Sequence, residues 1–413
     1  MKILLVHNTY QQPGGEDVVF DQERQLLERA GHQVVTYCRS NWEIAGYSGL
    51  KRLELMKHMV WATDTRREIA SLIGRDKPDL MHVHNTFLMV SPSVYAACRE
   101  ASIPVVQTLH NYRLLCPAAI FFRDGGVCEE CPEHGLWRGA LHGCYRDSRA
   151  ATSAVALMLT VHRWRRTWTW GVNCFIALSG FSRQKFIEGG IPAEKIAVKP
   201  NFVYADPGCR ARSGEYMLFI GRLSPEKRVV TLLAGWQKLQ APIPLRIIGG
   251  GSEREFLEAR AKQMRLSEVR FLGQLPRDEV FAALKGARCL IFPSEWYENF
   301  PMTIAESFAC GVPVLASRLG AMQEIVEDGR TGLHFTPGDS EDLAAKVEWA
   351  WTHPREMEEM GRQARAEYEV KYTAEQNYNM LMEIYHRVIA ARAGPVLAQL
   401  KDSGHAPAIG PGC

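Results

Sequence analysis

Residues 289–316 read CLIFPSEWYENFPMTIAESFACGVPVLA, and this stretch predicts a strand, a loop, a helix and a second strand in succession. The apolar run 289–292 has the length of a buried strand, and 311–316 is a second one. Pro301 suits the first position of the helix between them. Glu298 would then lie in the loop and Glu306 about a turn and a half into the helix. Both carboxylates can therefore face one bound molecule.

The same alternation of strands and helices runs through the whole chain. Strand-like runs are found at 2–6, 33–37, 80–83, 104–109, 174–177 and 196–199, and again at 216–220, 245–248, 269–272, 288–292, 312–316 and 332–335. Helical patterns separate them, which is typical of parallel sheets covered by helices. The sequence predicts an α/β fold of two doubly wound, Rossmann-like domains that face a central cleft.

The predicted domain boundaries follow from changes in composition along the 413 residues. We expect an N-terminal domain at 1–199 with a cysteine-rich insertion at 113–146, a polar linker at 200–214 and a C-terminal domain at 215–375. Helical periodicity is continuous from Pro354 to about Ala391, and the helix 376–393 is expected to return to the N-terminal domain. Residues 394–413 are expected to form a mobile tail.

Composition excludes several classes of protein. With 46% hydrophobic and 23% charged residues and a formal net charge of +3, the chain is unlike a dedicated nucleic-acid binder. The N-terminus reads as a first strand and not as a signal peptide, and no apolar run approaches the roughly 20 residues of a membrane-spanning helix. A cytoplasmic protein is expected.

Other candidate ligand-binding residues lie where strands end. Arg222 and Lys227 follow the first strand of the second half and together can neutralise a diphosphate. Gly14 and Gly15 follow the first strand and precede a helix. Backbone N–H groups at this position can donate hydrogen bonds to phosphate or sugar oxygens, although a Gly-Gly pair is more often only a turn. His110 ends another strand and can bond a sugar hydroxyl or phosphate, whereas His7, His82 and His84 are assigned structural roles. For the turn 249–252, a structural and a functional role remain equally open.

The glutamate pair with its seven-residue spacing, the Gly221-Arg222-Leu223 segment with Lys227, the Gly14-Gly15 pair and His110 together resemble the retaining, family-four glycosyltransferases of GT-B fold. The resemblance runs from about residue 1 to residue 392. It implies an acceptor domain at the N-terminus, a nucleotide-sugar domain at the C-terminus, and metal-independent transfer of a hexose with retention of configuration.

The resemblance also implies a role for each matching residue. Arg222 and Lys227 would bind the diphosphate of a UDP- or GDP-sugar, Glu306 the ribose diol, and Glu298 with the backbone of Asn299, Phe300 and Pro301 the donor sugar. Glu298, Arg222, Lys227 and His110 would be the catalytic residues. Two departures from the family pattern, Asn299 after the first glutamate and Ala321 after Gly320, leave the identity of the sugar open.

The insertion holds a cysteine cluster. Cys116, Cys128, Cys131 and Cys144 surround a central Cys-x-x-Cys in a segment with little helical or strand periodicity. Four thiolates are what a closed, structural zinc site requires, and we expect zinc here. Two disulfides or free thiols are the alternatives, and His134 or His142 can replace one cysteine.

A basic aromatic stretch follows the insertion. An apolar helical run at 150–161 leads into Arg163-Trp164-Arg165-Arg166-Thr167-Trp168, which pairs cations with aromatic rings as interfacial helices do. A helix packed within the first domain is the alternative. We favour peripheral contact with an anionic membrane, which suits an acceptor carried on a lipid diphosphate and a role in polysaccharide or glycolipid biosynthesis.

Two other functions remain open. A nucleotide-sugar epimerase of GT-B fold would share the donor site and transfer nothing to an acceptor. A zinc-stabilised nucleic-acid-binding protein would use the cysteine cluster and the arginines, but the modest charge disfavours it.

Overall fold

A computed structural model describes residues 1–11, 14–44, 46–48 and 50–402. Contacts between Cα atoms divide the chain into two compact units. Unit 1 comprises Met1–Thr108, Trp164–Ile176 and the chain from Tyr378 onward, and unit 2 comprises Leu109–Arg163 and Ala177–Asn377. The insertion is thus grouped with unit 2, whereas the sequence assigns it to the N-terminal domain.

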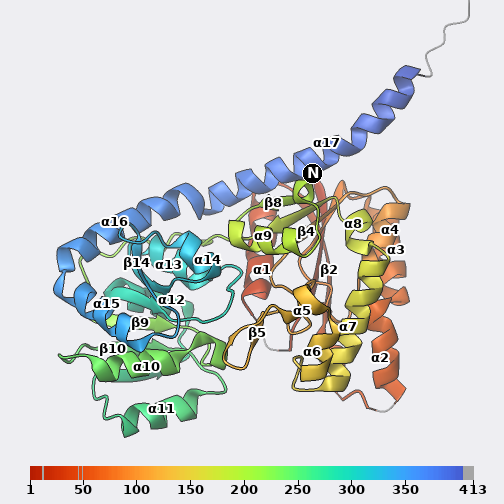
Figure 1. The fold of residues 1–413 in the computed structure, drawn as a ribbon. Helices are drawn as coiled ribbons and strands as arrows, with labels where there is room; N and C mark the ends of the chain where they lie inside the picture. The colour runs from red at the N-terminus through yellow and green to blue at the C-terminus, as the bar shows by residue number, and fades with distance from the viewer. Residues whose placement is uncertain (12–13, 45, 49, 403–413) are drawn as a thin grey trace, which may run out of the picture. The chain divides into compact units, whose positions relative to one another are not determined.

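Unit 1 is built on a parallel sheet (Figure 1). Its strands β1 (Lys2–Thr9), β2 (Gln33–Ser40), β3 (Leu80–Val83), β4 (Val105–Thr108) and β7 (Cys174–Ala177) are arranged in the order β2-β1-β3-β4-β7, and β8 (Ile196–Val198) completes the sheet at its edge. The apolar residues of β1, β3 and β4 are buried on both faces, as expected for a parallel sheet between helices. The six strands predicted from the first half of the sequence are all present.

Helices connect these strands. They are α1 (Gly15–Arg29), α2 (Leu50–Val60), α3 (Thr63–Asp76), α4 (Val94–Glu100) and α8 (Thr167–Gly171), with the short 3-10 turn η1 (Asn41–Ile44). In α3, Thr65, Ile69 and Ile73 recur every fourth residue and are buried, which is why this segment is helical and where it packs.

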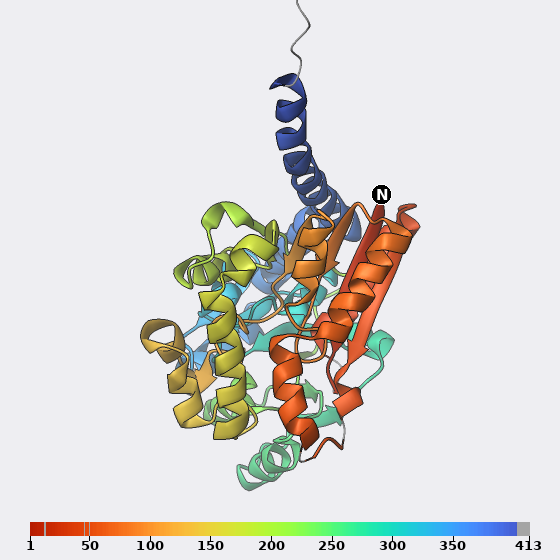
Figure 2. The ribbon, with the colours of Figure 1, turned by 90° about the vertical axis from the view of Figure 1, so that its right-hand side faces the viewer.

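The insertion has little regular structure of its own. A two-stranded antiparallel hairpin, β5 (Phe122–Arg123) and β6 (Gly126–Val127), precedes the short helices α5 (Glu130–His134) and α6 (Trp137–His142). The longer helix α7 (Arg149–Trp164) follows and is the long yellow helix of Figure 2. The hairpin was not predicted, because strands of two residues carry no periodic pattern.

The second sheet lies in unit 2 and is also parallel. Its order is β11-β10-β9-β12-β13-β14, formed by β9 (Tyr216–Ile220), β10 (Leu245–Ile248), β11 (Val269–Gly273), β12 (Ala287–Phe292), β13 (Val314–Ser317) and β14 (Gly332–Phe335). Tyr216 and Leu218 pack into one buried cluster and Met217 and Phe219 into another, so β9 has a core on each face. The six strands predicted for this half are present, and the double winding is confirmed.

Unit 2 also contains helices that follow α7 in the chain. They are α9 (Gly180–Glu188), α10 (Val229–Lys238), α11 (Arg254–Gln263), α12 (Arg277–Gly286), α13 (Met302–Ala309), α14 (Gly320–Ile325), α15 (Ser340–Thr352) and α16 (Pro354–Lys371), with 3-10 turns η2 (Ala193–Lys195) and η3 (Pro225–Lys227). Of these, α9 and the turn η2 lie between β7 and β8 of the first sheet, and the others come after β9 in the chain. Residues 200–214 contain no helix or strand beyond a bridge from Val203 to Thr373.

Two predictions for the C-terminal region need correction. The continuous helix predicted from Pro354 is divided in two, because α16 ends at Lys371 and α17 (Ala374–Asp402) begins after Tyr372 and Thr373. Tyr372 is buried and its carbonyl accepts the N–H of Val203, so tertiary packing interrupts the helix where periodicity does not. Residues 394–402 continue α17 instead of forming a tail, and 403–413 lie outside the described residues.

Candidate donor site

The predicted glutamate Glu298 is held by three donors. Its Oε1 accepts bonds from Lys227 Nζ at 2.5 Å, Trp296 Nε1 at 2.8 Å and Ser294 Oγ at 2.9 Å. Glu298 is buried, so these bonds satisfy a carboxylate that would otherwise be costly to remove from water. All three contacts fall on one oxygen. Oε2 has no hydrogen bond among the described residues and is the oxygen that can meet a ligand.

Two loops hold this contact in place. The loop 221–228 follows β9 and the loop 293–301 follows β12, and these two strands are neighbours in the sheet. The N–H of Glu295 donates to the carbonyl of Glu226, and Arg228 pairs with the Glu295 carboxylate at 2.9 Å. Adjacent parallel strands present their carboxyl ends at one edge, which explains how residues 71 positions apart meet.

Lys227 is held over aromatic rings as well as against the carboxylate. Its ammonium lies 5.1 Å from the ring centre of Phe292 and 5.6 Å from that of Trp296. Cation–π attraction and the ion pair both favour one position for the amine. The charge is therefore fixed at the carboxyl edge of the sheet and not dispersed on a flexible chain.

Arg222 is exposed and has no side-chain hydrogen bond or ion pair among the described residues. The backbone beneath it is firmly packed, because the N–H of Leu223 donates to Gly250 and its carbonyl accepts from Glu253. A Cβ on Gly249 would lie 1.9 Å from the carbonyl oxygen of Gly221. The glycines of the 249–252 turn are thus required for close backbone approach, and the structural role is the one that this packing supports.

Glu306 lies in the second turn of α13. Pro301 precedes this helix, which begins at Met302, one residue later than predicted. Burial raises the pKa of the Glu306 carboxyl to about 7, although the positive charge of Arg277 lowers it in part. The group therefore titrates near neutral pH, where it can change between an acceptor-only carboxylate and a neutral acid.

The three residues that follow Glu298, namely Asn299, Phe300 and Pro301, are buried. Asn299 donates from Nδ2 to the carbonyl of Leu109, and its own carbonyl accepts the hydroxyl of Ser179 at 3.2 Å. Phe300 belongs to the core of unit 2. His110 is half-buried and directly follows Leu109, so the structure brings the chain at His110 to the loop that carries Glu298.

The glycine pair opens α1 in unit 1. The N–H of Gly14 donates to Asp17 Oδ2 at 2.7 Å, and the other oxygen of Asp17 lies 2.8 Å from Nε2 of buried His7. Asp17 thus closes the first helical turn as in a capping box. Gly14 is already engaged, and Gly15 is the predicted glycine whose N–H has no partner among the described residues. Pro13, which precedes the pair, lies outside them.

A buried polar network that the sequence analysis missed lies at the carboxyl edge of the first sheet. Asn8 donates to Asn41 Oδ1 at 2.9 Å and accepts the N–H groups of Met89 and Val90, and Asn85 donates to the carbonyl of Asn8. Each of these asparagines lies at the end of β1, β2 or β3. A polar residue that ends a buried strand is the signal that would have identified them.

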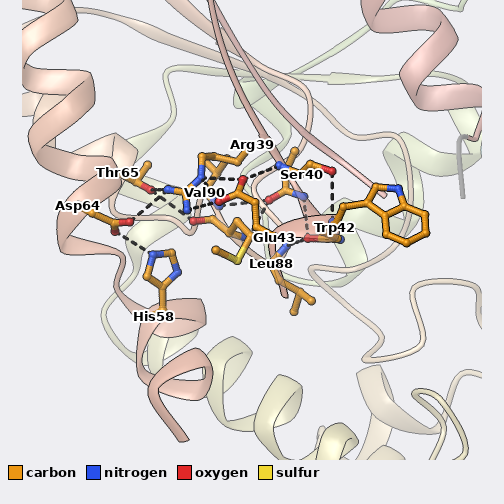
Figure 3. Close-up of polar contacts among 12 residues, drawn as sticks. Arg39, Ser40, Trp42, Glu43, His58, Asp64, Thr65, Leu88 and Val90 are labelled. Carbon is orange, nitrogen blue, oxygen red and sulfur yellow. Dashed lines mark hydrogen bonds and ion pairs between the residues drawn. The ribbon is translucent and has the colours of Figure 1, made fainter. Parts of the chain in front are cut away.

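Arg39 is the centre of a neighbouring ion-pair cluster (Figure 3). It contacts Glu43 at 2.6 Å and Asp64 at 3.1 Å, and Asp64 also lies 2.8 Å from His58 Nε2. The bonds that Arg39 donates to Glu43 raise the pKa of the Arg39 guanidinium and lower the pKa of the Glu43 carboxyl. Because Arg39 pairs with both Glu43 of η1 and Asp64 of α3, it fixes the segment after β2 against α3.

The four predicted zinc ligands lie in one region of the insertion. Cys116 and Cys131 are buried, Cys128 and Cys144 are half-buried, and all four are free thiols. The pKa of the Cys131 thiol is raised to about 12, chiefly by burial and in part by the nearby thiols of Cys116, Cys144 and Cys128. The four cysteines are therefore electrostatic neighbours, and no disulfide links any of them.

A different group of potential metal ligands lies closer together than the four cysteines. Within the described part of the chain, Glu23, His82 and His84 form the one set of three potential ligands whose atoms all lie within 4.8 Å, and the cysteines do not form such a set. His82 Nδ1 lies 2.7 Å from the hydroxyl of Tyr385 and its Nε2 lies 2.8 Å from Thr108 Oγ1. Both ring nitrogens already have protein partners, so we interpret this cluster as a buried network that joins α1, β3 and α17.

The basic aromatic stretch is partly buried. Arg163 donates to the carbonyl of Leu114, and Trp168 is only 8% exposed, whereas Trp164 is 81% exposed. The exposed face of α7 carries Arg149, Ser153, Leu157, Thr160 and Trp164, and Arg165 and Arg166 follow it. Arg163 was therefore wrongly placed among the surface cations. No helix of the described residues is long and apolar enough to cross a membrane.

Two family models match the chain. The model "Glycosyltransferase Family 4" matches residues 13–206, and the model "Glycosyl transferases group 1" matches residues 210–367. Each of the two segments thus resembles a glycosyltransferase family. The sheet orders and double winding of the chain are those of the GT-B fold, and the crystal structure of Anabaena HepE in complex with UDP superposes with a TM-score of 0.67 at 18% identity, covering 94% of this chain and 100% of that one.

The alignments with curated relatives cover only part of this chain and only part of each relative. Glycogen synthase of Mycobacterium tuberculosis is 28% identical over 305 residues, which are 71% of this chain and 66% of that protein. Phosphatidyl-myo-inositol mannosyltransferase of Mycobacterium leprae is 31% identical over 192 residues, which are 43% of this chain and 50% of that protein. The chain thus spans less than two thirds of the length of these relatives.

Two of the predicted site residues, Lys227 and Glu298, are in direct contact. Arg222 lies on the same loop as Lys227, and Glu306 lies on the helix that follows the Glu298 loop. Ser294, Trp296 and Arg277 act on the two glutamates and were not predicted, because single residues of these types are common in loops and helix starts. Only the fold shows that they face the carboxylates.

Proposed function

We propose that the protein transfers a hexose from a UDP- or GDP-sugar to a glycan or lipid-linked acceptor, with retention of anomeric configuration. The observation that carries the proposal is the Lys227–Glu298 pair at the carboxyl edge of a doubly wound sheet, in which Glu298 is buried and Lys227 half-buried. A fixed cation beside a carboxylate with one open oxygen suits a ligand that is an anion at one end and a polyol at the other.

Each site residue then has a defined task. Arg222 and Lys227 bind the diphosphate and stabilise the charge that develops as the nucleoside diphosphate leaves. Glu306 accepts two bonds from the ribose diol. Glu298, through Oε2, and the 299–301 backbone bind the sugar. The two cations supply the charge compensation, so the chemistry needs no bound metal ion, and positioning supplies the remainder of the rate enhancement.

Gly14 and Gly15 are proposed to bind phosphate or sugar oxygens of the nucleotide sugar, and His110 to act on the reacting sugar. Since the Gly14 N–H already donates to Asp17, the Gly15 N–H at the N-terminus of α1 is proposed to donate a hydrogen bond to a ligand oxygen. The chain at His110 lies beside the Glu298 loop through the Leu109–Asn299 bond, which supports a place for His110 near the donor sugar.

The enzyme is tested by product analysis with a labelled panel of UDP- and GDP-sugars. Lys227→Ala is expected to lower turnover more than tenfold, because the leaving diphosphate loses a fixed cation. Lys238→Ala is the matched control, since Lys238 pairs with Glu341 on the surface. Equal turnover for both variants would remove Lys227 from the mechanism, and a changed nucleotide sugar formed without acceptor would show an epimerase.

Two further properties belong to the proposal. The exposed face of α7, with Trp164, Leu157 and the flanking arginines, is proposed to contact the anionic inner face of the cell membrane, where a lipid-diphosphate acceptor is found. The relative named phosphatidyl-myo-inositol mannosyltransferase supports an acceptor carried on a lipid. Cys116, Cys128, Cys131 and Cys144 are proposed to hold a structural zinc ion, supported by four free thiols in one small segment.

A further inference from the structure

The cysteine-rich insertion contacts the donor loop through one carboxylate. Glu129 lies inside the Cys128–Cys131 motif, and its Oε1 accepts the hydroxyl of Tyr297 at 2.7 Å. Tyr297 directly precedes Glu298. The loop proposed to bind the donor is therefore attached to a segment 168 residues earlier in the chain.

A lysine completes this contact. Lys185 of α9 donates to both oxygens of Glu129, at 2.9 and 2.8 Å, and also pairs with Glu188 at 3.1 Å. Glu129 and Lys185 are 24% and 16% exposed at their side chains, so water screens the pair only in part. The Lys185 ammonium also lies 5.4 Å from the Tyr297 ring centre. Charge and hydrogen bonding thus act together on one tyrosine.

The Tyr297 ring is enclosed so that its hydroxyl has one direction. Phe181 packs against it edge-on at 4.7 Å, and Phe121 of the insertion lies 6.2 Å away. A Cβ on Gly320 would come within 3.3 Å of the ring, and Gly320 has a φ of 55°, which favours glycine. Because the ring is fixed on these sides, the position of Glu129 determines that of the Tyr297 side chain, and with it that of the adjoining Glu298 peptide.

We infer that Glu129 is a positioning residue for donor binding, through which the folded insertion fixes the orientation of the Glu298 carboxylate. This inference rests on the proposed function for its effect on catalysis. It assigns the insertion a role beyond stability, since ordering of the cysteine segment sets the affinity for the nucleotide sugar while the reacting groups themselves are unchanged.

The test compares Glu129→Ala and Tyr297→Phe with Glu130→Ala. Glu130 is the matched control, because it is the neighbouring carboxylate in the same motif and pairs with Arg123 and Arg138 inside the insertion. Each of the first two variants is expected to raise the donor KM about fivefold with kcat within twofold, since a hydrogen bond to a charged group is lost. The double variant should be no worse than either single one, and Glu130→Ala should stay within twofold.

Hydrogen exchange of residues 294–301 gives a second measurement that needs no activity. Faster exchange in Glu129→Ala and Tyr297→Phe, but not in Glu130→Ala, supports the inference. Unchanged exchange and unchanged KM in an active enzyme would overturn it. If Glu129→Ala fails to fold, Tyr297→Phe removes the same bond from the other side. A wild-type protein that binds no nucleotide sugar would refute the proposed function, while the exchange data still decide whether Glu129 orders the loop.

Discussion

At the scale of single residues, the site depends on groups whose charge is set by their surroundings. Glu298 stays beside a cation and two neutral donors, whereas Glu306 has no such pair and its pKa rises to about 7 because it is buried. Two carboxylates separated by seven residues thus have different environments. The Glu306 carboxyl changes charge near neutral pH, because burial raises its pKa.

This difference predicts the pH dependence of donor binding. A carboxylate accepts both hydroxyls of a diol, whereas its protonated form accepts fewer bonds, so affinity for a UDP- or GDP-sugar should rise as pH increases from 6 to 8 and level off above the pKa of about 7. Binding near pH 6 should release a proton. Calorimetry in two buffers of different ionisation enthalpy measures both effects.

Glu306→Gln serves as the control for this titration, since the amide keeps the shape and does not ionise. Its affinity should be lower at pH 8 and nearly flat between pH 6 and 8. The folded-state pKa lies above the usual value of 4.5, so ionisation of Glu306 also lowers stability as pH rises between these values. An equal slope in both proteins would show that another group titrates.

At the scale of elements, the insertion is the part that cannot fold by burial alone. The β5–β6 hairpin has two residues per strand, and α5 and α6 have five and six residues. Helices this short are marginal without tertiary support. Cys116 and Cys131 are buried within it, and a metal ion held by the cysteines would contribute to its order.

Elemental analysis of the purified protein should find close to one zinc ion per chain. Cys128→Ser should lose the zinc and become sensitive to proteases within 113–146, because the insertion then lacks its cross-link. Cys209→Ser changes an exposed cysteine outside the cluster and should keep the metal. Zinc retained by Cys128→Ser would direct attention to Glu23, His82 and His84, and a metal-free protein with a protected insertion would contradict the zinc site.

At the scale of the whole molecule, net charge conceals a local surface. The chain carries only +3, yet Arg146, Arg149, Arg165 and Arg166 are exposed around α7, and Asp147 is the single acid between residues 138 and 170. Exposed Trp164 and Leu157 lie on the same helix. Cations beside an exposed aromatic ring favour an anionic interface over bulk water.

Flotation with vesicles containing phosphatidylglycerol tests this surface. Replacing Arg165 and Arg166 with glutamate should weaken binding more than tenfold, since each cation contributes about 1 kcal/mol near an anionic surface. The charge-matched control replaces the exposed Arg254 and Arg260 of α11. Binding to neutral phosphatidylcholine should be weak, and equal flotation of both double variants would contradict the proposed membrane contact.

The sequence by itself determined the twelve strands of the two sheets, the double winding and the glycosyltransferase family, because burial on both faces leaves continuous apolar runs and the glutamate segment is specific. Only the tertiary structure decided that Lys227 contacts Glu298, that Arg163 is half-buried and bonds to Leu114, and that Tyr372 divides the last helices. It also placed Glu129 against Tyr297. These facts depend on contacts between residues far apart in the chain, and local periodicity carries no information about such pairs.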